Sequence, residues 1–264
     1  MDNESIMDNQ IVTDKACVTD NERAMDKEKA FLRSAMLIGK DNLLKLQRSH
    51  VAVFGVGGVG GFAVEALCRS GVGEITVIDN DTVSETNINR QIIATTETIW
   101  LDKTEVIKKR LESINPDIKV NAVKEFFLPS VSDKFDFCAF DYVIDAVDTV
   151  NAKIEIIKKA VECNTPIITC MGTGKKLNPQ LLKVSIIENT KYCPLAKVVR
   201  KELKKLGIKG IKTVYSEEET IEADFKGDEI IKGNRTPPAS MIFVPACAGL
   251  LIAKEVVLDL INNL

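Results

Sequence analysis

The sequence is poor in the residues on which several common functional sites depend. It contains a single histidine, His50, and its seven cysteines form no C-x-x-C pair. We therefore expect neither a histidine general base nor a zinc site built from four cysteines. An odd number of cysteines without such pairs also indicates reduced thiols in a cytoplasmic protein. Cys170 and Cys247 lie in apolar runs without a basic neighbour, and are interpreted as small core side chains rather than nucleophiles.

Long apolar stretches are also absent. No run of about 18 apolar residues exists, and no basic region followed by an apolar one opens the chain, so neither a membrane-spanning helix nor a signal peptide is expected. Residues 1–26 are acidic and contain few apolar side chains, which predicts a mobile tail. Residues 27–264 are predicted to form a single domain.

What the chain does have is a glycine-rich loop between a predicted strand and a predicted helix. The strand Val51–Phe54 is followed by Gly55-Val56-Gly57-Gly58-Val59-Gly60-Gly61, and the helix extends to Ser70. Glycines at such a junction let backbone N–H groups approach a pyrophosphate at the helix N-terminus. Asp79 ends the next strand, Ile75–Ile78, where it is placed to bind ribose hydroxyls. The loop alone fits any nucleotide-binding protein, including an NAD-dependent dehydrogenase.

Strands and helices alternate along the rest of the chain. Further helices are predicted at Lys27–Leu37, Asn42–Gln47, Lys103–Ile114, Asn151–Glu162 and Leu195–Leu206, and strands at Lys119–Val123, Tyr142–Val147, Pro166–Cys170, Leu182–Ile187 and Thr213–Tyr215. Met241–Leu260 is predicted as strand or loop to about Pro245, followed by a buried helix. This pattern predicts an α/β fold: a Rossmann-like, open, mainly parallel sheet with helices on both faces and a C-terminal antiparallel extension.

Two cations and a carboxylate follow the glycine loop. Arg90 and Lys103 lie beyond the ribose-binding strand, and two cations suit the triphosphate of ATP better than the single pyrophosphate of NAD. The alternative is that both are ordinary surface charges. Asp148 follows a strand that ends at the same edge of the sheet, where it fits either a Mg²⁺ ligand or the N-cap of the next helix.

Together these residues resemble the ubiquitin-activating enzyme superfamily, which includes bacterial adenylyltransferases of thiamine and molybdopterin biosynthesis. The resemblance runs from about Phe31 to Leu260 and implies ATP and Mg²⁺ as cofactors. It implies nucleotide contacts from Gly55, Gly57, Gly58, Gly60, Asp79, Asp81, Asn87, Arg90, Gln91 and Lys103. It also implies Mg²⁺ at Asp148 and a homodimer in which Arg33 completes the partner's site, so that the catalytic residues are Arg33, Arg90, Lys103 and Asp148. A second arginine usual in the family is Ala30 here.

The second half of the chain resembles one branch of that superfamily, the tRNA threonylcarbamoyladenosine dehydratases. The matching motifs are Met171-Gly172-Thr173-Gly174, Lys176-Leu177-Asn178-Pro179, Pro194-Leu195-Ala196-Lys197-Val198-Val199-Arg200 and Phe243-Val244-Pro245. The resemblance implies that the carboxylate of N6-threonylcarbamoyladenosine at tRNA position 37 is adenylated and then cyclises with net loss of water. The aspartate usual before Pro-Leu is Cys193 here.

A basic segment supplies a candidate surface for the tRNA. Cations outnumber the single acid, Glu202, between Lys197 and Lys212, and we interpret residues 188–240 as a basic, tRNA-facing insertion. The alternative is a solvated helix face. The candidate tRNA contacts are Lys197, Arg200, Lys201, Lys204 and Lys205.

Other functions stay open at this point. An adenylyltransferase for the C-terminal carboxylate of a ubiquitin-like sulfur carrier would share the first chemical step. An NAD-dependent oxidoreductase leaves Arg90 and Lys103 unexplained, and a binding-only module would follow if Ala30 and Cys193 mark lost activity. The sequence specifies neither the tRNA species nor a sulfur-relay partner.

Overall fold

A mixed sheet forms the centre of the molecule. The computed structural model describes residues 27–222 and 238–262, so the predicted acidic tail, residues 1–26, lies outside it. Within these residues the sheet has seven strands in the order β3-β2-β1-β4-β5-β7-β6. The strands are β1 His50–Phe54, β2 Glu74–Ile78, β3 Lys119–Val123, β4 Tyr142–Asp145, β5 Ile167–Cys170, β6 Leu182–Ile186 and β7 Lys212–Ser216. Neighbours pair in parallel except β6 and β7, which confirms the predicted parallel sheet with an antiparallel extension.

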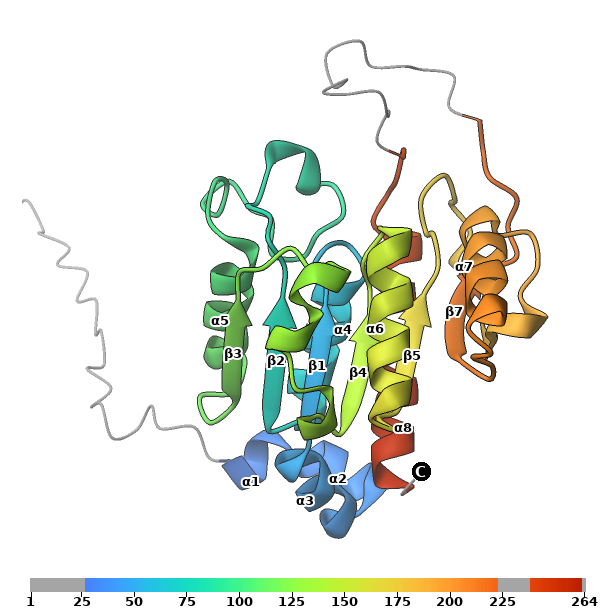
Figure 1. Cartoon of the computed structure of the whole chain (residues 1–264). Helices are drawn as coiled ribbons and strands as arrows, with labels where there is room; N and C mark the ends of the chain where they lie inside the picture. The colour runs from blue at the N-terminus through green and yellow to red at the C-terminus, as the bar shows by residue number, and fades with distance from the viewer. Residues whose placement is uncertain (1–26, 223–237, 263–264) are drawn as a thin grey trace, which may run out of the picture.

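Helices cover both faces of this sheet (Figure 1). They are α1 Lys27–Ala30, α2 Leu32–Ile38, α3 Lys40–Arg48, α4 Gly60–Ser70, α5 Lys103–Ile114, α6 Val150–Glu162, α7 Pro194–Lys205 and α8 Phe243–Ile261. Short 3-10 turns are η2 Glu85–Asn87, η3 Pro129–Lys134, η4 Phe137–Ala139, η5 Pro179–Leu181 and η6 Ile187–Asn189. Among the described helices, none is long and apolar enough to cross a membrane.

The alternation of side chains along β1 divides the core into two halves. Val51 and Val53 belong to the cluster that includes buried residues of α4, α5 and α8. Ala52 and Phe54 belong to the cluster on the other face, beneath α6 and α7. Because successive side chains of a strand point to opposite faces, a continuous apolar strand requires helices on both sides.

Two helix boundaries differ clearly from the predicted ones, and one predicted segment takes part in the sheet. The predicted helix Lys27–Leu37 is broken at Phe31, which turns into the core between α1 and α2. The C-terminal helix already begins at Phe243, with Pro245 in its first turn, where a missing N–H costs nothing. The segment 188–240, predicted as a basic insertion, contains β7, which lies between β5 and β6 in the sheet, as well as α7.

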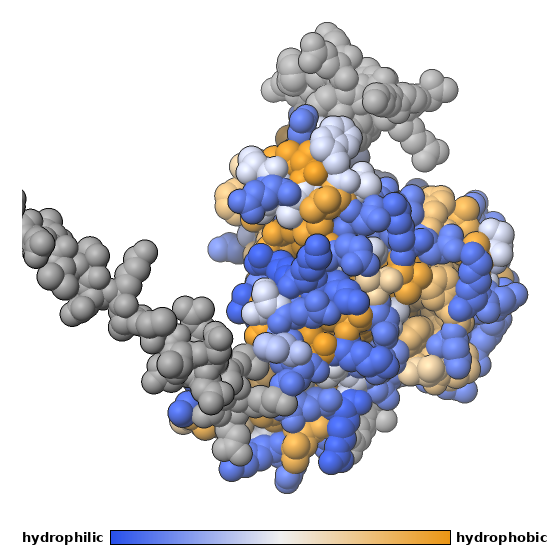
Figure 2. Space-filling model, turned by 90° about the vertical axis from the view of Figure 1, so that its left-hand side faces the viewer, coloured by the Kyte–Doolittle hydropathy of each residue, from blue (hydrophilic) through white to orange (hydrophobic). Residues whose placement is uncertain are grey.

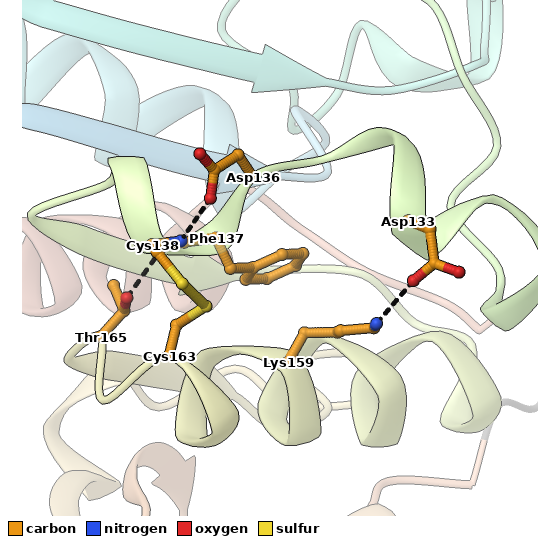
Figure 3. Close-up of a disulfide and its surroundings, with 7 residues drawn as sticks. All are labelled: Asp133, Asp136, Phe137, Cys138, Lys159, Cys163 and Thr165. Atoms are coloured by element: carbon orange, nitrogen blue, oxygen red, sulfur yellow. Dashed lines mark hydrogen bonds and ion pairs between the residues drawn. A yellow bond between two sulfur atoms is a disulfide. The ribbon is translucent and has the colours of Figure 1, made fainter.

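The structure also corrects the expectation that all cysteines are reduced. Cys138 of η4 is joined by a disulfide to Cys163 at the C-terminal end of α6, as Figure 3 shows. Around it, the Thr165 hydroxyl donates to the carbonyl oxygen of Phe137 at 2.8 Å. The free cysteines among the described residues are Cys68, Cys170, Cys193 and Cys247. The two bonded residues are 25 positions apart, and no sequence pattern marks their contact.

Candidate functional site

The glycine loop brings the N-terminus of α4 against the end of β1. A Cβ atom at Gly60 would lie 1.8 Å from the carbonyl oxygen of Gly55, so no other residue fits there. Gly55 itself has a φ of +89°, which favours glycine. No side chain caps α4, so the N-terminal end of its dipole is open to an anion, although the Gly61 N–H already donates to the Gly57 carbonyl at 3.0 Å. Gly60 therefore allows the close approach of α4 to the end of β1.

The loop forms one wall of a cavity of about 490 Å³ at the carboxyl ends of the parallel strands. This is the edge at which open α/β sheets bind ligands. All the residues predicted to bind nucleotide or metal line it except Gly60, and they come from separate parts of the chain. They are Gly55, Gly57, Gly58, Asp79, Asp81, Asn87, Arg90, Gln91, Lys103 and Asp148.

Two aspartates after β2 organise this cavity. The Asp79 carboxylate accepts hydrogen bonds from the backbone N–H of Val56, at 2.8 Å, and of Asp81, at 2.9 Å, and so ties the glycine loop to β2. The Asp81 carboxylate receives the Lys103 ammonium at 2.8 Å. Lys103 is only 5% exposed, so this ion pair holds a nearly buried cation at the wall of the cavity.

The loop 84–91 supplies the remaining polar groups. The Arg90 guanidinium donates to the Thr86 carbonyl at 2.7 Å and to Asn89 Oδ1 at 3.0 Å. Burial lowers the pKa of Arg90, yet an arginine keeps its charge at neutral pH. Gln91 is buried, and within the described residues its Oε1 is an acceptor without a hydrogen-bond partner. A bound polar ligand would satisfy this atom.

Asp148 stands at the wall of the cavity and does not cap a helix. The N-cap of α6 is Thr149, whose hydroxyl donates to the Asp148 carboxylate at 3.3 Å. The described residues contain no cluster of three His, Cys, Asp or Glu side chains that would hold a metal alone. Mg²⁺ commonly takes one or two carboxylates, phosphate oxygens and water, so the donor set fits Mg²⁺ arriving with a nucleotide.

A buried ion pair that the sequence analysis missed lies directly beneath this wall. Asp145 ends β4, Lys153 lies on the inner face of α6, and both side chains are 0% exposed. The Lys153 ammonium donates to Asp145 at 2.9 Å and to the Cys170 carbonyl at 2.7 Å. The Thr169 hydroxyl also donates to Asp145. The pair therefore joins the ends of β4 and β5, from which the segments carrying Asp148 and Thr173 emerge. The sequence gives one sign of this pair: Asp145 and Lys153 are charged residues within an otherwise apolar strand and a largely apolar helix face.

Comparison with known proteins places the chain in a family. The model of the ThiF family matches residues 31–262. The chain belongs to the ThiF family. It is 41% identical over 242 residues to the tRNA threonylcarbamoyladenosine dehydratase of Bacillus subtilis, which covers 89% of this chain and 95% of that protein.

Solved structures within the ThiF family agree with this assignment. The Escherichia coli tRNA N6-threonylcarbamoyladenosine dehydratase TcdA in complex with AMP superposes with a TM-score of 0.82 at 30% identity, over 92% of this chain and 96% of that one. Its complex with ATP gives a TM-score of 0.81 at the same identity and coverage. The resemblance found in the sequence is thereby confirmed.

Two groups of predicted residues of this ThiF-family chain lie away from the cavity. Arg33 is exposed on α2, which lies at the amino ends of the strands, opposite the cavity (Figure 1). On α7, Lys197, Lys201 and Lys204 are exposed. Arg200 differs, because its guanidinium donates to the carbonyl and hydroxyl oxygens of Thr190, at 2.8 and 2.6 Å, and anchors α7.

We expect Lys153→Met to destabilise the fold by about 3–5 kcal/mol, because it leaves the Asp145 carboxylate buried without its cation. Lys158→Met is the matched control on the same helix. The Lys158 side chain is 41% exposed, and its ion pairs with Glu155 and Glu162 are long, at 3.5 and 4.0 Å, so this variant should change stability by less than about 1 kcal/mol. Urea unfolding measures both. Equal stability of the two variants would show that the buried pair contributes little.

Proposed function

We propose that this chain is an ATP-dependent tRNA threonylcarbamoyladenosine dehydratase that forms AMP. It adenylates the carboxylate of N6-threonylcarbamoyladenosine at tRNA position 37 and promotes its cyclisation with net loss of water. The observation that supports this best is the cavity itself, which joins a glycine loop, Arg90, the Lys103–Asp81 pair and Asp148 at one edge of the sheet. The similarity to the Bacillus subtilis enzyme extends over nearly the whole chain.

The chemistry needs positioning and charge balance rather than an enzyme nucleophile. A carboxylate oxygen attacks the α-phosphorus of ATP, the bond to pyrophosphate breaks, and an acyl-adenylate forms. The neighbouring ureido nitrogen then attacks the acyl carbon within the same side chain, and AMP leaves. The Gly57–Gly58 backbone and the α4 N-terminus would hold the phosphates, and Asp79 the ribose. Bound Mg²⁺ would neutralise phosphate charge, with Asp148 as its protein ligand.

The buried cysteines fit this scheme. Burial raises the pKa of the Cys170 thiol to about 12, so the thiolate needed for covalent catalysis is not formed at neutral pH. Cys193, at the position where the family usually has aspartate, is buried at the N-cap of α7 without a side-chain capping bond.

Asp148→Asn should abolish AMP formation while leaving the fold intact, because Asp148 is exposed and no described cation pairs with it. The assay incubates protein with ATP, Mg²⁺ and threonylcarbamoylated tRNA, and follows AMP and the mass of digested nucleosides. Asp117→Asn, at the far end of the sheet, is the control. Loss of one water from the nucleoside with the wild type supports the proposal. Pyrophosphate exchange that appears only with a ubiquitin-like carrier protein would instead favour a sulfur-carrier adenylyltransferase.

For the tRNA, we propose a contact surface formed by Lys197, Lys201 and Lys204 on α7. Among the described residues, none of these three ammonium groups has an ion-pair partner, whereas Lys205 is bound to Glu202 at 2.7 Å. Free cations along one helix suit a phosphate backbone. Arg200 serves to anchor the helix and Lys205 is partly neutralised, so we expect smaller contributions from both.

The double variant Lys201→Glu with Lys204→Glu should weaken tRNA binding by about tenfold or more and flatten its salt dependence, because phosphate contacts are lost. ATP affinity should not change. Lys183→Glu, an exposed position on β6, is the control for a single charge reversal elsewhere on the surface. Unchanged tRNA affinity in a filter-binding assay would make α7 a solvated helix face.

We further propose a homodimer in which Arg33 enters the partner's cavity. On α2, Met36 and Leu37 are 78% and 86% exposed, and Trp100, on the loop before α5, is 74% exposed. Figure 2 shows apolar side chains gathered at the top of the molecule, where that loop lies in Figure 1. Exposed apolar side chains of this size are typical of an interface.

Mixing two inactive variants tests this arrangement. Arg33→Ala and Asp148→Asn should each be inactive alone, but a mixed dimer has one site with both wild-type residues and should recover about a quarter of the wild-type activity in an equal mixture that exchanges freely. Arg48→Ala, on α3, is the control for a lost surface arginine. A mixture that recovers nothing despite subunit exchange would place Arg33 outside the partner's site.

The proposed compartment is the cytoplasm, where tRNA and ATP are available. Glutathione and thioredoxin keep most thiols reduced there, so the Cys138–Cys163 disulfide is unusual for a protein of that compartment. A sulfur-relay protein stays a predicted partner.

A further inference from the structure

A second cavity, of about 180 Å³, adjoins the one described above. Ser240 lines both cavities, and Thr173 of the first lies two residues before Lys175 of the second. The second cavity is lined by Lys175, Lys176, Leu177, Ile221, Ala239, Ser240 and Met241. It is smaller than the roughly 300–1,000 Å³ of sites that hold drug-sized ligands, so it suits a short side chain and not another nucleotide.

Three segments distant in sequence are joined to form this cavity. The backbone N–H of Lys175 donates to the Ala239 carbonyl at 2.7 Å, and that of Ile221 donates to the Lys175 carbonyl at 2.9 Å. The Glu218 carboxylate accepts the backbone N–H of Leu177 at 2.9 Å. These bonds hold Lys175 at a φ of +58°, a left-handed backbone conformation that is unfavourable for a lysine. The surrounding hydrogen bonds therefore fix a position that Lys175 would not adopt alone.

The cavity combines an apolar wall with one available cation. Leu177, Ile221 and Met241 are each exposed to solvent, although they line a hollow. The Lys176 side chain is buried, 3% exposed, and its ammonium donates to the Glu218 carbonyl. Lys175 is exposed, and within the described residues its ammonium has no partner. A ligand with a short aliphatic part and one negative charge would match both features.

We propose that this second cavity binds the threonylcarbamoyl side chain of the modified nucleotide, with its carboxylate on Lys175 and its methyl group against Leu177 and Met241. The inference rests on the proposed function. Electrostatics supports this assignment. The substrate carboxylate must approach the anionic triphosphate, and the two negative charges repel each other. The Lys175 ammonium, beside the wall that both cavities share at Ser240, reduces this repulsion. Lys175 is here a substrate-binding residue.

Two variants test the assignment against matched controls. Leu177→Trp fills the cavity and should lower kcat/KM for threonylcarbamoylated tRNA at least tenfold without changing ATP affinity, while Leu181→Trp, on η5 outside the cavity, should be near wild type. Lys175→Met should weaken the binding of threonylcarbamoylated tRNA by about tenfold and leave that of unmodified tRNA unchanged, so that the preference for the modified tRNA is lost. Lys183→Met controls for the lost surface charge.

Each outcome bears on the proposal separately from the function. If Leu177→Trp turns over like Leu181→Trp, the cavity does not hold the side chain. If Lys175→Met weakens modified and unmodified tRNA equally, Lys175 contacts the phosphate backbone instead of the carboxylate. The exposed Lys175 can be replaced without disturbing the core, so it decides the question even if Leu177→Trp fails to fold. Failure of the wild type to convert threonylcarbamoylated tRNA would refute the proposed function itself.

Discussion

The contact between the start of α4 and the end of β1 is the constraint on which the site and much of the fold depend. It exists because Gly60 has no side chain: any Cβ there would collide with the Gly55 carbonyl. A second close approach that only glycine permits occurs at Gly249 of α8, where a Cβ would lie 2.4 Å from the Val59 carbonyl oxygen. Consequently α8, from the far end of the chain, packs on α4 and brings Pro245 to the cavity. The helix N-terminus offered to an anion is thus held from both sides by close backbone packing.

The second determinant is electrostatic and lies beneath the same edge of the sheet. Burying Asp145 and Lys153 costs several kcal/mol for each ion, and only good hydrogen bonding offsets that cost. Here Lys153 also reaches the Cys170 carbonyl, while Asp145 also accepts from the backbone N–H of Val147. An apolar pair of similar volume would not be bound to either strand end. We infer that the pair is retained because it fixes the directions in which the segments after β4 and β5 leave the sheet.

Local signals predicted the elements well where they were strong, and failed where distant contacts decide. The helix Lys103–Ile114 and the strand Lys119–Val123 have the predicted bounds, because Asn115-Pro116 separates them. The residues of the cavity were predictable because parallel strands bring their carboxyl ends to one edge. The break at Phe31, the Cys138–Cys163 bond and the inward guanidinium of Arg200 each depend on a partner distant in sequence or on core packing, which periodicity does not record.

The charge within the cavity connects the proposed metal, the proposed dimer and the second cavity. Asp79, Asp81, Glu125 and Asp148 line it, against Arg90 and Lys103 alone. Lys103 is paired with Asp81, and the Arg90 guanidinium is already bound to neutral oxygens. Within the described lining, one chain therefore offers a tetra-anionic nucleotide the charge of Arg90, which no ion pair offsets, together with backbone N–H groups at α4. In the proposals above, additional cations would come from Mg²⁺ on Asp148, from Arg33 of a second copy and, for the substrate carboxylate, from Lys175. Each of these would supply charge at a different part of the reacting complex: Mg²⁺ and Arg33 at the phosphates, and Lys175 at the carboxylate that attacks them.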